Sequence, residues 1–80
     1  MKLPSVGRIV HYVSYGTQDR TFESEHRAAI VTDVHNPNEP KSVLSLCVIN
    51  PTGLYFSVGI CYDEDCKPGT WHWPEYVAEV

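Results

Sequence analysis

Length, composition and charge restrict this chain to one small domain. Its 80 residues form a single core, because folding a chain of this size hides only about 60 to 65% of the surface that the unfolded chain exposes. A composition of 42% hydrophobic and 20% charged residues is typical of a folded domain and argues against disorder. A net charge of −4, without any cluster of Lys or Arg, disfavours a protein that coats DNA or RNA, since that affinity requires many neutralised phosphates. We therefore treat residues 1–80 as one domain that binds no extended nucleic acid.

Hydropathy and cysteine usage indicate the compartment. No apolar run reaches the roughly 20 residues that a transmembrane helix needs, and residues 1–4 are too few for a signal peptide. We therefore expect a cytoplasmic protein with no membrane partner. Cys47, Cys61 and Cys66 cannot all pair within one chain, and a reducing cytosol keeps thiols free. Cys47 lies in an apolar run, where a thiol behaves as a small buried hydrophobe.

The first half of the chain contains two predicted strands. Residues 8–15 are rich in β-branched and aromatic side chains and lie between Gly7 and Gly16, which predicts a strand. Residues 17–25 are polar and predict a loop. Two alanines in residues 27–34 are compatible with a helix, but the β-branched residues that follow them favour a second strand. A second loop is predicted over residues 35–41, which contain two prolines.

Three more strands are predicted in the second half. Residues 43–49 are apolar at nearly every position, as in a strand that is covered on both faces. Asn-Pro-Thr-Gly at residues 50–53 predicts a turn. Residues 54–61 alternate strictly, and this alternation predicts that one face is core; that face carries Leu54, Phe56, Val58 and Ile60.

A loop and a short strand are predicted near the end of the chain. Residues 63–69 form an acidic loop, and residues 70–73 form a last short strand that Pro74 stops. Residues 75–80 are expected to fray or to add one helical turn. Five short strands predict an all-β fold, a small five-stranded antiparallel barrel of the SH3-like or OB-like kind. Two Trp, five Tyr and two Phe exceed what so small an interior holds, so some aromatic side chains must lie outside or between subunits.

The segment that contains Trp71, His72 and Trp73 is the first candidate site. In a strand the two indoles share one face and His72 takes the other. Two alternatives are open for the indoles. They close one end of the barrel, or at least one of them, Trp71 in our prediction, forms a flat platform on which a ligand ring stacks. In the second case His72 hydrogen-bonds a polar ligand group or a neighbouring chain.

Other candidate ligand-binding residues lie on different predicted strands and turns. His11 and Tyr15 share a strand face. Arg27 opens a strand and offers a fork of donors to phosphate or carboxylate, although a surface salt bridge is an equally good explanation. Asn50 and Thr52 belong to a turn that the fold needs in any case, but their side chains can also bind a base edge or a phosphate oxygen.

Metal and enzyme motifs are weak. Cys61, Cys66 and His72 suggest zinc, but structural zinc sites usually draw paired ligands from a tight knuckle, and no such pair occurs here. The sequence contains no G-x-S-x-G, P-loop or H-E-x-x-H motif. We therefore predict no catalytic residues, no metal and no cofactor, and a protein that is not an enzyme.

Four sequence blocks resemble a known family. They are HYxSYG within Val6–Thr17, RAAIVT at Arg27–Thr32, NPTG at Asn50–Gly53 and PGTWHWPE at Pro68–Glu75. The chain resembles short proteins encoded by phages and bacterial genomes, most of which carry no assigned activity, and the similarity covers nearly its whole length. Phages use compact non-enzymatic proteins of this size to disarm host immunity. The resemblance therefore implies an anti-defence role in the cytoplasm of a bacterial host.

Together these observations lead to one functional hypothesis and one alternative. The hypothesis is a sponge that sequesters a small nucleotide-derived immune signal, a cyclic oligonucleotide or a cyclic ADP-ribose derivative. Its pocket would be lined by Trp71, Tyr15, Arg27, Asn50 and Thr52. Because one small barrel has little concavity, we expect a homo-oligomer with pockets near its interfaces. The alternative is a module that docks an aromatic patch on a host defence or replication protein.

Overall fold

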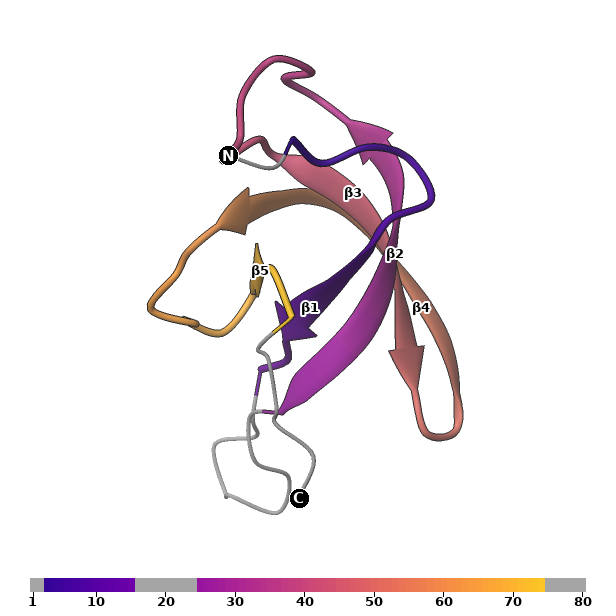
Figure 1. Cartoon of the computed structure of the whole chain (residues 1–80). Helices are drawn as coiled ribbons and strands as arrows, with labels where there is room; N and C mark the ends of the chain where they lie inside the picture. The colour runs from indigo at the N-terminus through magenta and orange to yellow at the C-terminus, as the bar shows by residue number, and fades with distance from the viewer. Residues whose placement is uncertain (1–2, 16–24, 75–80) are drawn as a thin grey trace, which may run out of the picture.

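Five β-strands close into a barrel in the computed structural model, which describes residues 3–15 and 25–74 (Figure 1). They are β1 (Ile9–Val13), β2 (His26–Val34), β3 (Leu44–Asn50), β4 (Gly53–Tyr62) and β5 (Thr70–His72). The predicted all-β class and small five-stranded barrel are confirmed. Neighbours in the barrel are also neighbours in the chain, which fits an SH3-like barrel better than the Greek-key order of an OB fold.

One strand pair departs from the prediction that the barrel is antiparallel. Among the described strands, β1–β2, β2–β3, β3–β4 and β1–β5 are antiparallel, whereas β4 and β5 run parallel. A connection between two parallel strands must carry the chain back to the end at which the first strand began its pairing, and this usually takes a dozen or more residues. Here the parallel ladder contains two residue pairs, Cys61 with Thr70 and Tyr62 with Trp71. The chain therefore travels back only about 7 Å along the strand direction. The short loop 63–69 spans that distance.

The strand boundaries agree with the sequence prediction to within about two residues. Gly and Pro delimit most strands as expected, and residues 35–41 form the predicted loop. The predicted loop 17–25 lies almost entirely outside the described residues, and so does the segment 75–80.

The core is centred on Trp71, which is 0% exposed. Strands β1 to β4 supply the aliphatic side chains of the same cluster: Val10, Ala29, Val31, Leu44, Leu46, Val48 and Ile60. The indole Nε1 donates a hydrogen bond of 2.9 Å to the buried backbone oxygen of Ser42. The rings of Tyr62 and Trp73 meet the indole edge to face, with centroids 4.9 and 5.6 Å away. Trp71 is thus packed and hydrogen-bonded as a core residue.

A bulge in β4 overturns the prediction that Leu54, Phe56 and Val58 form a core face. Leu46 pairs with Ser57 and Leu44 with Ile60, so β4 contains one more residue than β3 over this stretch. Gly59 adopts a φ of 76° there, a conformation that glycine accepts without steric cost. Because one extra residue exchanges the two faces of a strand, Ile60 is buried while Leu54, Phe56 and Val58 are exposed.

Trp71→Ala tests the central position of the indole. We expect this substitution to lower the free energy of unfolding by about 3–5 kcal/mol, because it leaves a cavity in the core. Chemical denaturation followed by circular dichroism measures the change. Phe56→Ala removes an exposed ring and is the control, with an expected change within about 0.5 kcal/mol. Equal stability of the Trp71→Ala variant and the wild type would contradict the assignment.

Candidate functional site

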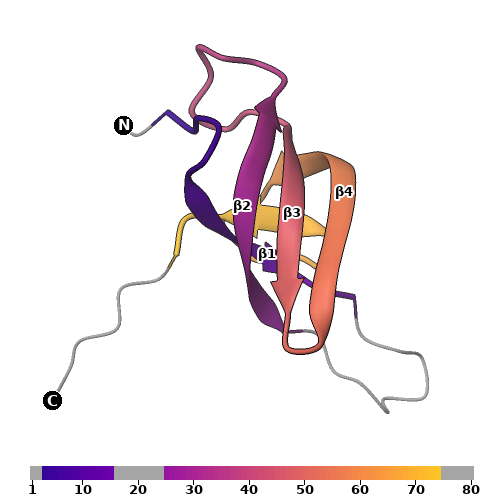
Figure 2. The same cartoon turned by 90° about the vertical axis from the view of Figure 1, so that its right-hand side faces the viewer.

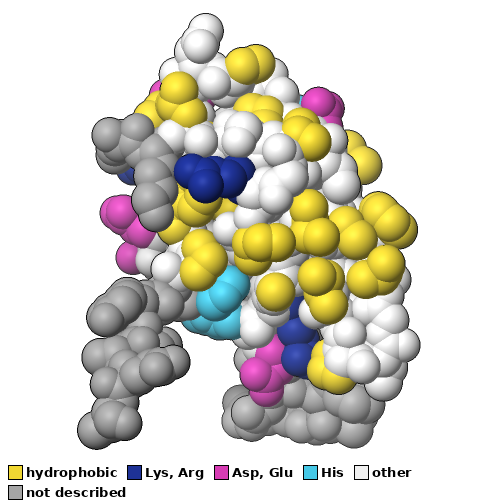
Figure 3. Space-filling model, turned by 45° about the vertical axis from the view of Figure 1, so that its right-hand side comes forward, with side chains coloured by type: hydrophobic (Ala, Val, Ile, Leu, Met, Phe, Trp, Pro, Cys, Tyr) yellow, Lys and Arg dark blue, Asp and Glu magenta, His cyan; other side chains and the backbone are white. Residues whose placement is uncertain are grey.

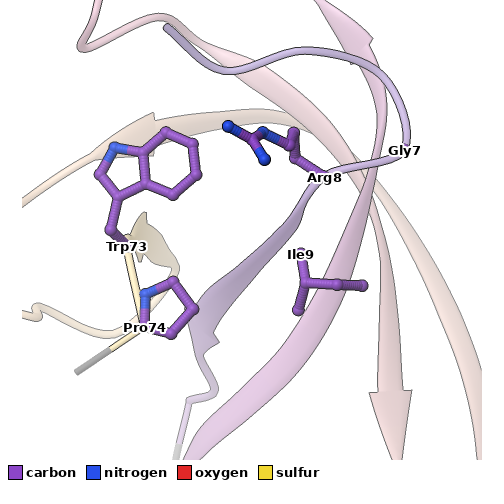
Figure 4. A pocket seen from close by; sticks show the side chains of 5 residues that line it. All are labelled: Gly7, Arg8, Ile9, Trp73 and Pro74. Atoms are coloured by element: carbon purple, nitrogen blue, oxygen red, sulfur yellow. The ribbon is translucent and has the colours of Figure 1, made fainter. Parts of the chain in front are cut away.

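A cavity of about 420 Å³ lies where the start of β1 meets the residues after β5. Its lining consists of Gly7, Arg8, Ile9, Trp73 and Pro74. Figure 4 shows the indole of Trp73 and the guanidinium of Arg8 pointing toward each other across the cavity, with the side chains of Pro74 and Ile9 on the opposite side. We call this site the Arg8–Trp73 pocket.

Backbone hydrogen bonds fix the position of Arg8. Gly7 N donates to Val31 O at 2.8 Å, and Val31 N donates to Arg8 O at 2.9 Å. Gly7 has a φ of 92°, which lets the chain turn into β1 immediately before Arg8. The pocket therefore has one wall at the start of β1 and another on the two residues that follow β5.

The chemistry of the pocket suits a ring that carries negative charge. An indole provides a flat surface for stacking, and a guanidinium provides a planar fork of donors for phosphate or carboxylate. Its volume lies within the range of about 300–1,000 Å³ that is common for small-molecule sites. None of the seven ligand-binding residues predicted from the sequence lines it.

Trp71 and His72, two of those seven residues, lie on opposite sides of β5. The complete burial of Trp71 leaves no face of its indole for a ligand ring, so the indole takes the other predicted role and closes the barrel interior. His72 points to the outside of the sheet and is still only 5% exposed.

Tyr15 and Arg27 lie at one end of the barrel. Arg27 pairs with Tyr12 across β1 and β2, and its Nε is buried without a hydrogen-bond partner among the described residues. Burial raises the pKa of the Tyr12 phenol, and the nearby phenols of Tyr15 and Tyr55 raise it further. Tyr15 is exposed and packs against Gly69, where a Cβ would clash with its phenol.

Asn50 and Thr52 lie near the same end. Ala29 pairs with Val48, and continuing this antiparallel register brings Asn50 to the level of Arg27. Thr52 follows in the exposed turn between β3 and β4. The structure thus gathers Tyr15, Arg27 and Asn50 at one end. Arg27 and Trp71 pair with Tyr12 from its two sides, but the indole is fully buried and is not part of a surface with them.

His11 belongs to a different group. His11, His26 and His72 come from β1, β2 and β5, and their nearest ligand atoms all lie within 4.8 Å of one another. The three rings meet edge to face, and His26 and His72 are closest, with centroids 4.8 Å apart.

Cys66, in the loop before β5, contacts one member of this cluster, His72. Its Sγ lies 3.5 Å from Nδ1 of His72. Cys66 is the non-glycine residue with a positive φ in the described chain, at 60°. This conformation costs about 1–2 kcal/mol for a residue with a Cβ. Such strain occurs where the surrounding structure requires a particular side chain in that place.

A serine, a histidine and an aspartate also meet, without forming a catalytic relay. His35 Nε2 lies 3.0 Å from Ser45 Oγ and 3.8 Å from Asp33 Oδ2. In a Ser-His-Asp triad the serine and the carboxylate contact opposite ring nitrogens, whereas here both approach Nε2.

Sequence reasoning missed Arg8 and His26. It considered Cys66 together with His72 and Cys61 as zinc ligands, but rejected that site because the spacing lacks a tight knuckle. The sequence did point to Trp73, because it was one of the two indoles considered as a stacking platform for a ligand ring. His26 and Arg8 gave no local signal, because their sites depend on which residues lie opposite each other in neighbouring strands.

Comparison with protein-family models, curated proteins and solved structures finds no match for this chain. Within the described residues, no helix is long and apolar enough to cross a membrane.

Tyr12→Phe tests the pKa of the buried phenol. The folded protein holds the Tyr12 proton more tightly than the unfolded chain, whose phenol has an ordinary pKa of 10.0. The stability from this difference is complete below pH 10 and falls as the pH rises through the higher folded pKa. We expect the free energy of unfolding to decline less steeply above pH 10 in the variant, as measured by urea denaturation. An unchanged slope would show that Tyr12 does not contribute.

Proposed function

We propose that the protein is a non-enzymatic binding module that docks on other proteins through the outer side of β4. The observation that carries this proposal is the exposure of three large apolar side chains on one strand. Leu54, Phe56 and Val58 are 64, 68 and 77% exposed. Contiguous apolar surface of this kind marks interaction sites in soluble proteins.

The exposed side chains extend into a wider surface, which we call the outer apolar face. Cross-strand pairing places Ile9 opposite Ile30, Ile30 opposite Cys47, and Cys47 opposite Phe56. The face consists of Ile9, Ile30, Cys47, Ile49, Leu54, Phe56 and Val58. In Figure 3 hydrophobic side chains gather in a band over this side of the barrel, and histidine side chains border it.

The edge of β4 supports the same proposal. Figure 2 shows β4 outermost beside β3 and β2, and in the described chain β5 pairs only with Cys61 and Tyr62 of β4. Among the described residues, 53–58 have no strand partner on the side away from β3, and β4 contains no charged side chain. Proteins usually protect such edges with Lys or Pro. An unprotected apolar edge favours the addition of a strand from another chain.

A second copy of this chain is one occupant that offers a matching edge. Two β4 strands paired antiparallel about a two-fold axis would join both edges and merge the two outer apolar faces into one continuous apolar surface. A strand of a different protein would bind in the same manner.

Val58→Lys tests the proposal, because lysine on an edge strand opposes strand addition. We expect sedimentation velocity to show self-association of the wild type, weakened at least tenfold in the variant. We also expect the variant to lose partner proteins that the wild type captures from host cells. Val6→Lys is the matched control, since Val6 lies outside the face and is 66% exposed.

Two results together would overturn the proposal. The first is a wild-type protein that remains monomeric at several hundred micromolar. The second is a set of captured proteins that is the same for Val58→Lys and Val6→Lys.

The Arg8–Trp73 pocket supports a second candidate function, the sequestration of a small nucleotide-derived signal. Its indole and guanidinium match the base and the phosphate of such a ligand, and the pocket would replace the predicted Trp71 platform. This function agrees with the anti-defence role that the family resemblance implies.

Melting temperatures with a panel of cyclic oligonucleotides and cyclic ADP-ribose isomers test this second function. A ligand at about 100 times its dissociation constant adds about 2.7 kcal/mol of stability. We expect one ligand to raise the melting temperature of the wild type and of Arg27→Gln, but not of Arg8→Gln. A shift lost only in Arg27→Gln would move the site to the tyrosine end of the barrel. The absence of any shift would reject the function.

A further inference from the structure

We propose that His11, His26, His72 and Cys66 bind one zinc ion. The site would tie β5 to β1, β2 and the loop that precedes β5. This inference is independent of the outer apolar face and of the Arg8–Trp73 pocket, and it assigns a metal site where the sequence spacing predicted none.

Strand register brings the three histidines together on the outside of the barrel. His11 pairs directly with His72 across β1 and β5. His26 pairs with Val13, two residues along β1 from His11, and side chains two residues apart share a face. The ligands are separated by up to 61 positions in the sequence, so their proximity depends on closure of the barrel.

The three histidines lie near the spacing of ligands in a tetrahedral zinc site, and Cys66 contacts one of them, His72. With zinc bonds of about 2.05 Å to nitrogen and 2.3 Å to sulfur, tetrahedral ligands lie about 3.4 Å apart for two nitrogens and about 3.6 Å for nitrogen and sulfur. Cys66 Sγ and His72 Nδ1 are 3.5 Å apart. The histidine ligand atoms lie within 4.8 Å of one another, so the distance between any two of them must shorten by about 1.4 Å or less for zinc to bind. The His26 side chain is exposed, and its rotation can bring its ligand atom closer to the other two.

The donor set favours zinc over hard cations. Three imidazoles and one thiolate are borderline or soft ligands, whereas Mg²⁺ and Ca²⁺ take carboxylate, carbonyl and water oxygens. Four protein ligands make a closed site, as in structural zinc centres. Binding releases the proton of the Cys66 thiol to solvent.

The backbone at Cys66 is the second observation for the site. Cys66 N donates to Asp63 O at 3.1 Å, and Asp65 N donates to Asp63 Oδ1 at 2.8 Å. This tight turn holds Cys66 at its positive φ and directs its thiol to His72. Glycine would satisfy the turn without strain, so the presence of a cysteine indicates a role for its side chain.

A zinc ion would stabilise the attachment of β5, the strand that has few backbone pairs with its neighbours. β5 has three residues and pairs through two residues with β1 and through two with β4. Small domains often rely on a metal or a disulfide to supplement a limited core.

Cobalt(II) titration and metal analysis of the whole chain test the proposal. We expect one zinc per chain, competition between zinc and cobalt, and a cobalt spectrum with tetrahedral d–d bands and a thiolate charge-transfer band. Zinc at about 100 times its dissociation constant should raise the melting temperature by about 10 °C or more. His26→Gln should weaken binding at least tenfold.

Cys66→Gly separates metal binding from folding. Since glycine relieves the strained φ, the metal-free variant should melt at or above the temperature of the metal-free wild type, yet lose the charge-transfer band and most of its zinc affinity. Cys61→Ser and His35→Gln are matched controls outside the cluster and should bind as the wild type does.

Four results would each overturn the proposal. The first two are no stoichiometric binding of cobalt or zinc, and a charge-transfer band lost in Cys61→Ser instead of Cys66→Gly. The other two are unchanged affinity in His26→Gln and full affinity in Cys66→Gly.

Discussion

Closure of the barrel through β5 is the constraint on which the rest of the structure depends. This strand has three residues and forms few backbone pairs, so backbone hydrogen bonds alone hold it weakly. The indole of Trp71 supplies the missing stabilisation, because it is fully buried and donates to the Ser42 carbonyl. A ring of this size contributes several kcal/mol when it is buried, a large part of the stability of a small domain.

The alternation along β5 then determines what lies inside and outside. Since Trp71 points into the core, His72 must point outward, where it meets His11, His26 and Cys66. Trp73 comes one residue later and contributes both to the core and to the pocket opposite Arg8. One anchored indole therefore positions two surface sites.

Local sequence patterns predicted the strands and loops well, since β-branched runs, prolines and glycines act within a few residues. They failed for the faces of β4, because the alternation from Leu54 to Ile60 continues across the bulge, and Gly59 was the one residue in it that pointed to an extra residue. They also failed for the candidate sites. The meeting of His11, His26 and His72 depends on the pairing of three strands, and the positions of Arg8 and Trp73 depend on how the barrel closes. The stacking role that we predicted for Trp71 overlooked how much this small core needs one large ring.

The histidine cluster and the Arg8–Trp73 pocket share β5, and this connection has an energetic consequence. A ligand that orders His72 and the adjacent Trp73 together would lower the entropy cost of binding at the pocket. By thermodynamic reciprocity, a ligand in the pocket would then strengthen binding at the cluster by the same factor. The outer apolar face reaches the same part of the barrel, because its Ile9 lies on β1 and also lines the pocket. His11 of the histidine cluster lies on that strand as well, directly opposite His72 of β5. The three surfaces therefore meet along β1, next to the strand that closes the barrel.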